Sequence, residues 1–127
     1  MTNKRKSAGG THQIQYHLVW CPKYRHGVLT GDIASARDEA LHAKASALGV
    51  EILSLAIRPD HVHLFVTGTP TMAVNQLVRH FKGYTAHELR ARFPSLKTRL
   101  PSLWSRSYYA GSIGQVSDET VRRYIEA

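Results

Sequence analysis

Two strand-like segments joined by a short turn lie at the centre of the sequence, and they constrain the fold more than any other feature. Residues 50–57 read VEILSLAI and residues 61–67 read HVHLFVT. Both runs are short, apolar and rich in branched residues, which favours strands inside a sheet. Pro59 and Asp60 occupy favoured turn positions between them. The two segments therefore predict an antiparallel hairpin.

The segments on either side of this hairpin supply two helices and two further strands. Apolar and polar residues alternate over residues 12–21, which predicts a strand that ends at a proline. Apolar stripes near period 3.6 predict helices over residues 32–48 and 71–92. Residues 103–110 again have strand character, after an expected basic loop over residues 95–102.

The order strand, helix, strand, strand, helix, strand predicts an α+β fold of the ferredoxin-like split βαβ type. One antiparallel sheet would carry two helices on one face and leave the other face for a ligand or partner. A last helix is expected over about residues 117–127, capped by Ser117 or Asp118. We therefore expect a flexible basic arm over residues 1–10 and a single domain over residues 11–127.

Composition places the chain among ordinary globular proteins of the cytoplasm. Its 127 residues are 43% hydrophobic and 20% charged, enough for one domain with a core. No run reaches the roughly 18 apolar residues of a membrane span, and the basic N-terminus lacks the apolar region of a secretory signal. Cys21 is the only cysteine, so no internal disulfide is possible, which fits a reducing compartment.

Charge indicates a polyanionic partner, with ordinary solubility charge as the alternative. Seventeen Lys and Arg against nine Asp and Glu give a net charge of +8. Basic and aromatic residues interleave over residues 23–26, 79–84 and 104–109. Cations bind phosphates and aromatic rings stack on unpaired bases, so the mixture favours single-stranded nucleic acid, although each cluster alone is typical of a solvated basic face. The candidate contacts are Lys23, Tyr24, Arg25, Arg79, Lys82, Arg90 and Arg106.

The motif His61-Val62-His63 is the sharpest chemical feature. Residues two apart on a strand point the same way, so both imidazoles would lie side by side on one face. Such a pair can chelate a divalent ion and leave coordination positions for a phosphate oxygen. Two half-exposed structural histidines are the alternative. Phe65 shares their face and is expected to be partly covered.

The six tyrosines are candidate nucleophiles, because a phenol that attacks a phosphodiester conserves the bond for later rejoining. Tyr16 is expected in the core, and Tyr108 and Tyr109 in strand packing or base stacking. Tyr124 lies on the short polar terminal helix, where a packing role is the alternative to catalysis.

The chain resembles the single-tyrosine HUH transposases of bacterial and archaeal insertion sequences, close relatives of the REP-associated tyrosine transposases. HUH denotes His, a hydrophobic residue and His. The resemblance runs from about His12 to Ala127. Four ordered segments carry it: YHLVWCPKYRHGVL (16–29), IRPDHVHLFV (57–66), HFKGYTAHELRARFP (80–94) and LWSRSYYAGSIGQVSDETVRRYIEA (103–127).

The resemblance implies a metal-assisted enzyme that cleaves and rejoins single-stranded DNA. His61 and His63 would bind Mg²⁺ or Mn²⁺, and Tyr124 would be the nucleophile, leaving a 5′-phosphotyrosine and a free 3′-OH. The family's third ligand, typically glutamine, follows the tyrosine by four residues, which is position 128, one beyond Ala127.

The resemblance also implies the partners. Family members recognise subterminal DNA hairpins and form homodimers in which the tyrosine helix of one subunit can complete the histidine site of the other. Two alternatives remain open: a non-catalytic single-stranded nucleic-acid binder on the same fold, and a host-domesticated relative that acts on chromosomal repeats.

Overall fold

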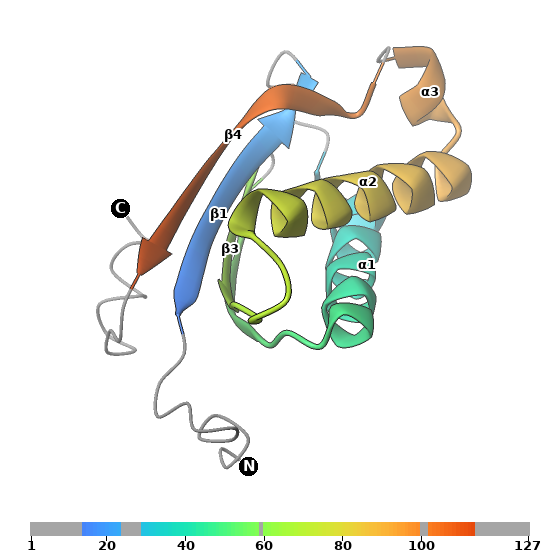
Figure 1. Cartoon of the computed structure of the whole chain (residues 1–127). Coiled ribbons are helices and arrows are strands. Elements are labelled where there is room, and N and C mark those ends of the chain that lie inside the picture. Colours follow the sequence, from blue (N-terminus) through green and yellow to red (C-terminus); the bar gives the residue numbers. More distant parts are fainter. Residues whose placement is uncertain (1–13, 24–28, 59, 100–101, 114–127) are drawn as a thin grey trace.

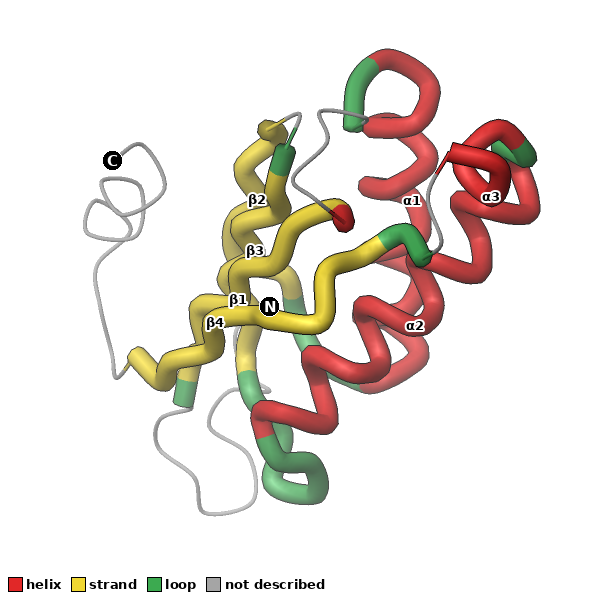
Figure 2. The backbone as a smooth tube through the Cα atoms, turned by 90° about the horizontal axis from the view of Figure 1, so that it is seen from above, coloured by secondary structure: helices red, strands yellow, loops and turns green. Residues whose placement is uncertain are grey.

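A computed structural model describes residues 14–23, 29–58, 60–99 and 102–113. Within these ranges, an antiparallel sheet carries helices on one face and leaves the other face open (Figures 1 and 2). The predicted succession strand, helix, strand, strand, helix, strand is present, with the short helix α3 (Ser95–Arg99) added before the last strand. The elements are β1 (Gln15–Pro22), α1 (Gly31–Leu48), β2 (Ile52–Arg58), β3 (His61–Thr67), α2 (Val74–Arg92), α3 (Ser95–Arg99) and β4 (Trp104–Ile113).

The sheet has the strand order β2-β3-β1-β4, and all neighbouring strands are antiparallel. The predicted β2–β3 hairpin is therefore present, and β1 lies between β3 and β4. Val19 of β1 is opposite His63 of β3 on one side and Tyr109 of β4 on the other. This register brings the histidine motif close to the aromatic residues of β4.

Alternation along the two central strands separates a buried face from an open face. Val62 and Leu64 of β3 are fully buried, as are Leu18 and Trp20 of β1 to within 1%. They pack against one side of α2, whose buried residues are Leu77, Val78, Phe81, Thr85 and Leu89. The residues between them on β1 and β3 point away from the helices.

One local prediction was wrong, and another was right for a reason that the sequence does not show. The expected loop over residues 95–102 contains α3, because Leu96 is fully buried and its backbone N–H bonds to the carbonyl of Phe93 at 2.9 Å. β1 ends at Pro22, as predicted, and this proline is the last paired residue of the strand, opposite Trp104. The register shifts between Trp20 and Pro22, and such an irregularity tolerates a residue without a backbone N–H.

Several predicted features lie outside the described residues. These are the arm over residues 1–10, the helix over residues 117–127 with Tyr124, and the loop residues Tyr24 and Arg25. Within the described ranges, no helix is long and apolar enough to span a membrane.

A buried hydrogen-bond chain fixes β4 to α2. The indole Nε1 of Trp104 donates to Oγ1 of Thr85 at 3.0 Å, and that hydroxyl donates to the carbonyl of Phe81 at 2.7 Å. Thr85 is fully buried and Trp104 is 6% exposed. A buried donor without its acceptor costs stability, so this hydrogen bond matters more than an exposed one.

We predict that Thr85→Val lowers the free energy of unfolding by about 1–3 kcal/mol, because it leaves the Trp104 indole N–H buried without an acceptor. Chemical denaturation measures the change. Thr98→Val is the matched control, since the Thr98 hydroxyl is exposed. Equal stability of the two variants would contradict the prediction.

Candidate functional site

Three histidines gather on the open face of the sheet. His61 and His63 lie side by side on β3, as their spacing predicts, with ring centroids 4.6 Å apart. Both are partly exposed, while Val62 between them is buried. His17 joins them from the neighbouring strand β1 and is only 4% exposed.

The Nδ1 atom of each histidine in the pair has a polar neighbour. Nδ1 of His63 lies 3.2 Å from Nε2 of His17 in hydrogen-bond geometry. Nδ1 of His61 lies 2.7 Å from Oδ1 of Asp60, at ion-pair distance but without the geometry of a hydrogen bond. Polar neighbours on Nδ1 are typical of imidazoles that bind metal through Nε2.

Electrostatics keep two of these imidazoles neutral. Burial, and then the neighbouring His63, lower the pKa of His17 from 6.5 to about 4. Burial lowers the pKa of His63 as well, with further contributions from His61 and Arg58. A neutral imidazole is the form that ligates metal, so protons compete weakly for His63 at neutral pH.

An open hollow of about 350 Å³ lies over the histidine pair. Its other lining residues are Val19, Trp20, Cys21, Ser107, Tyr108 and Tyr109. The described part of the chain holds no group of three His, Cys, Asp or Glu side chains arranged for a metal. The pair therefore offers two imidazole nitrogens. That set fits a divalent ion whose other positions are filled by oxygen ligands.

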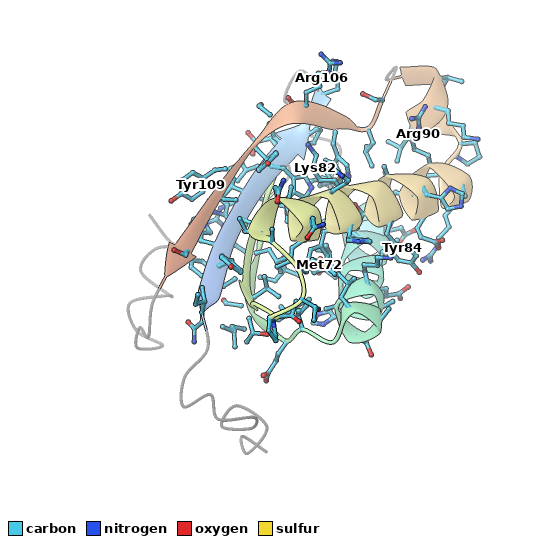
Figure 3. All side chains as sticks on the ribbon, in the orientation of Figure 1. Met72, Lys82, Tyr84, Arg90, Arg106 and Tyr109 are labelled. Atoms are coloured by element: carbon cyan, nitrogen blue, oxygen red, sulfur yellow. The ribbon has the colours of Figure 1, made fainter. Side chains whose placement is uncertain are left out.

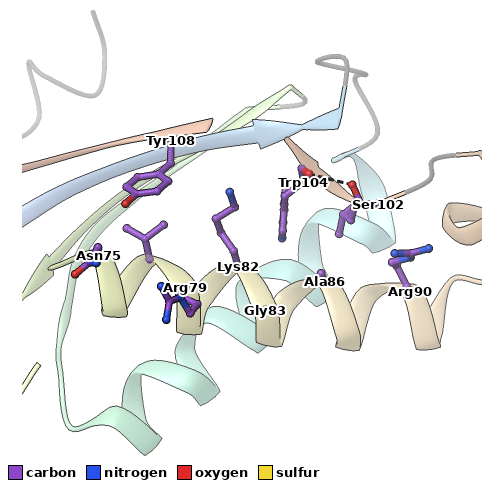
Figure 4. Close-up of a pocket in the computed structure, with 11 residues that line it drawn as sticks. Asn75, Arg79, Lys82, Gly83, Ala86, Arg90, Ser102, Trp104 and Tyr108 are labelled. Carbon is purple, nitrogen blue, oxygen red and sulfur yellow. Dashed lines mark hydrogen bonds between the residues drawn. The ribbon is translucent and has the colours of Figure 1, made fainter. Parts of the chain in front are cut away.

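A second hollow, of about 390 Å³, lies on the helix side of the sheet between α2 and β4 (Figure 4). Arg79, Lys82 and Arg90 of α2 line it, and Trp104 and Tyr108 of β4 form its other side. Three of the predicted DNA contacts therefore share one cavity. The pocket combines aromatic surface with cations, which suits a nucleotide.

Lys82 occupies the middle of this pocket. Its Nζ donates to the carbonyl of Ser105 at 2.7 Å and lies 5.5 Å from the centre of the Tyr108 ring. Burial lowers the pKa of Lys82, and Cys21 partly offsets this effect. Lys82 thus ties α2 to β4 as well as adding positive charge.

Strand β4 separates the two hollows. Tyr108 and Tyr109 are successive residues, 46% and 51% exposed. The Tyr108 ring faces Lys82 on the helix side, whereas Tyr109 contacts His17 on the open face. Figure 3 shows Tyr109 directed away from the helices and Lys82 directed from α2 toward β4.

The remaining predicted residues are placed as follows. Arg106 is exposed on β4, between the pocket residues Trp104 and Tyr108. Lys23 follows β1, and its backbone N–H bonds to the carbonyl of Leu103 at 2.8 Å. His17 was not singled out from the sequence. Alternation did put it on the open face of its strand, but only the β1–β3 register brings it to His63.

Residues 10–127 match the family model described as "Transposase IS200 like". The chain is 35% identical over 125 residues to the ISDra2 transposase TnpA of Deinococcus radiodurans, covering 97% of this chain and 89% of that protein. It is 27% identical over 117 residues to the transposase for insertion sequence element IS200 of Salmonella typhimurium, covering 91% and 77%.

Solved structures agree. A crystal structure of a candidate transposase from Deinococcus radiodurans superposes with a TM-score of 0.79 at 34% identity, covering 95% of each chain. A REP-associated tyrosine transposase bound to a REP hairpin has the same fold, with a TM-score of 0.61 at 16% identity over 90% of this chain and 62% of its own. The family match over nearly the whole sequence, together with these relatives, establishes that the chain belongs to the IS200-like transposases.

Proposed function

We propose that this transposase cleaves and rejoins single-stranded DNA at insertion-sequence ends, with Tyr124 as nucleophile and His61 with His63 as metal ligands. The observation that carries the proposal is the pair of imidazoles facing an open hollow on the face of the sheet opposite α1 and α2. Membership of the family, with its ferredoxin-like fold, supports the same chemistry.

The proposed reaction exchanges one phosphoester bond for another. The phenol oxygen of Tyr124 bonds to phosphorus and the bond from phosphorus to O3′ breaks. The phenol proton passes to solvent, and the departing O3′ takes up a proton. A 5′-phosphotyrosine and a 3′-OH result. Attack by a 3′-OH of another strand reverses the exchange and joins DNA without an external energy source.

A divalent ion, Mg²⁺ or Mn²⁺, is the proposed cofactor. When bound, it neutralises charge that develops on the scissile phosphate. The residues that would hold it are His61 and His63, and burial, followed by the charges of His61 and Arg58, lowers the pKa of His63 and so favours its neutral imidazole. Mn²⁺ accepts imidazole more readily than Mg²⁺, which prefers oxygen ligands.

Single-stranded DNA folded into a subterminal hairpin is the proposed substrate. The positive charges of Arg79, Lys82 and Arg90 in their shared pocket favour binding of a phosphate backbone, and Tyr108 beside them can stack on a base. The fold relative that is bound to a REP hairpin supports the hairpin form. Lys23, Arg106 and the loop residues Tyr24 and Arg25 are proposed as further DNA contacts.

A homodimer is the proposed assembly, with active sites shared between subunits. β4 forms one edge of the described sheet and exposes two large aromatic residues, Tyr108 and Tyr109. An exposed edge strand with apolar side chains is a template for pairing with another chain. This edge supports association next to the histidine site.

We predict that Tyr124→Phe keeps hairpin binding and abolishes both cleavage and the covalent adduct, because only the attacking oxygen is removed. Labelled hairpin DNA incubated with Mn²⁺ and run on a denaturing gel measures the adduct. Tyr84→Phe, on α2, is the control and should form it normally. An adduct with Tyr124→Phe would disprove the assignment. Binding by wild type with no adduct would favour the non-catalytic binder.

We predict that His61→Ala weakens Mn²⁺ binding by about tenfold or more, because loss of a ligand nitrogen should cost at least as much as loss of an outer-shell partner, which costs about 10–100-fold. Isothermal titration calorimetry without DNA measures the affinity. His42→Ala on the exposed side of α1 should leave it unchanged. Unaltered Mn²⁺ affinity of His61→Ala would place the metal elsewhere.

We predict that Arg79→Ala and Arg90→Ala each weaken hairpin binding and make it less dependent on salt. The log–log slope of affinity against salt concentration should fall by about 0.7 to 0.9 for each phosphate that the variant no longer neutralises. Fluorescence anisotropy over a salt series measures both effects. Arg92→Ala is the control on the same helix, since Arg92 instead pairs with Glu39 of α1 at 3.2 Å. Equal weakening in all three variants would rule out a specific role for the pocket.

A further inference from the structure

We propose that His17 is a positioning residue for the metal site: its Nε2 accepts a hydrogen bond from Nδ1–H of His63 and so leaves Nε2 of His63 as a lone-pair donor toward the hollow. The inference rests on the proposed function, because it assigns His17 a role toward the metal that His61 and His63 would bind. The contact that carries it is the 3.2 Å distance between Nε2 of His17 and Nδ1 of His63.

The ring of His17 is held in one orientation by its surroundings. It stacks on Phe65 with centroids 4.3 Å apart and an angle of 2° between the rings. Tyr109 packs against it edge-on at 5.5 Å. Gly111 lies opposite His17 in the sheet, and the Tyr109 ring occupies the space that a side chain at Gly111 would fill. His17 therefore presents a fixed nitrogen to its neighbour.

The direction of the hydrogen bond decides whether His63 can bind metal. Between two neutral imidazoles, one nitrogen donates and the other accepts. If His17 donated, the proton of neutral His63 would lie on Nε2, and that atom would have no lone pair for an ion. If His63 donates, its Nε2 is free. Metal binding by His63 through Nε2 therefore requires His17 to accept.

His17 contacts the metal-binding pair from outside and is not a third ligand. It is 4% exposed, and its Nε2 is directed at His63. No three metal-binding side chains converge within the described ranges. An outer residue that fixes the tautomer and ring orientation of a metal-binding histidine typically changes metal affinity by about 10–100-fold when it is replaced.

Two substitutions separate positioning from packing. His17→Phe keeps an aromatic ring against Phe65 but removes the acceptor. His17→Gln removes the ring but supplies a carboxamide oxygen near the position of Nε2. The first measurement is the tautomer of His63 in the metal-free protein, read from the ¹⁵N chemical shifts of its ring nitrogens. The second is Mn²⁺ affinity by calorimetry, without DNA.

We expect wild type to carry the His63 proton on Nδ1. His17→Phe should shift that proton toward Nε2 and weaken Mn²⁺ binding by about 10-fold or more, while His17→Gln should restore most of both. A wild-type His63 protonated on Nε2 would overturn the proposal. So would His17→Phe with unchanged tautomer and affinity. Because the wild-type tautomer needs no variant, the proposal is decided even if His17→Phe does not fold.

The proposed reaction and the proposed role of His17 are contradicted by different results. Absence of a covalent adduct in wild type, with the His63 tautomer and the affinity differences as expected, would overturn the proposed reaction and support the role of His17. Equal tautomers and affinities in all three proteins, with a normal adduct in wild type, would overturn only the role of His17.

Discussion

The antiparallel pairing of β1 with β3 is the constraint on which the rest of the structure depends. It joins the two central strands in the register that places Val19 opposite His63 and Trp20 opposite Val62. The side-chain period of a strand is two residues, so a slip by one residue would turn the histidines into the core and Val62 to solvent. Burial of Val62 and Leu64 against the helices therefore also fixes which way the imidazoles point.

The same pairing sets the surroundings of the site. β1 brings His17 to one side of the pair, and β4 follows on the other side of β1 with Tyr109. Hydrogen bonds from Trp104 and Lys82 fasten β4 to α2. The edge strand thus has a histidine hollow on one face and a cationic hollow on the other.

The local pattern of apolar and polar residues was enough to predict most of the strands and helices. The bounds expected for β3 agree with the structure, and the helix over residues 32–48 differs by one residue at its start. Gly49 ends that helix in the left-handed conformation, with φ of 75°, as its sequence position suggests. The same pattern failed where contacts between residues distant in sequence decide the local structure. Nothing local marks Leu96 as buried, so α3 was expected as loop.

For the candidate site, the sequence predicts only which residues share a face of their own strand, because side chains alternate between the two faces with a period of two residues. Spacing alone puts His61 and His63 on one face, and alternation puts His17 on the open face of its own strand. Neither observation predicts that β1 and β3 pair in the register that brings His17 to His63, because these two residues are 46 apart in sequence. The partner on Nδ1 of His63, which decides which nitrogen is free, is therefore a tertiary property. The His-x-His motif can bind a metal in a defined way only when a neighbouring strand fixes the tautomer of His63. The chemistry of the motif therefore depends on the pairing of the strands and not on its three residues alone.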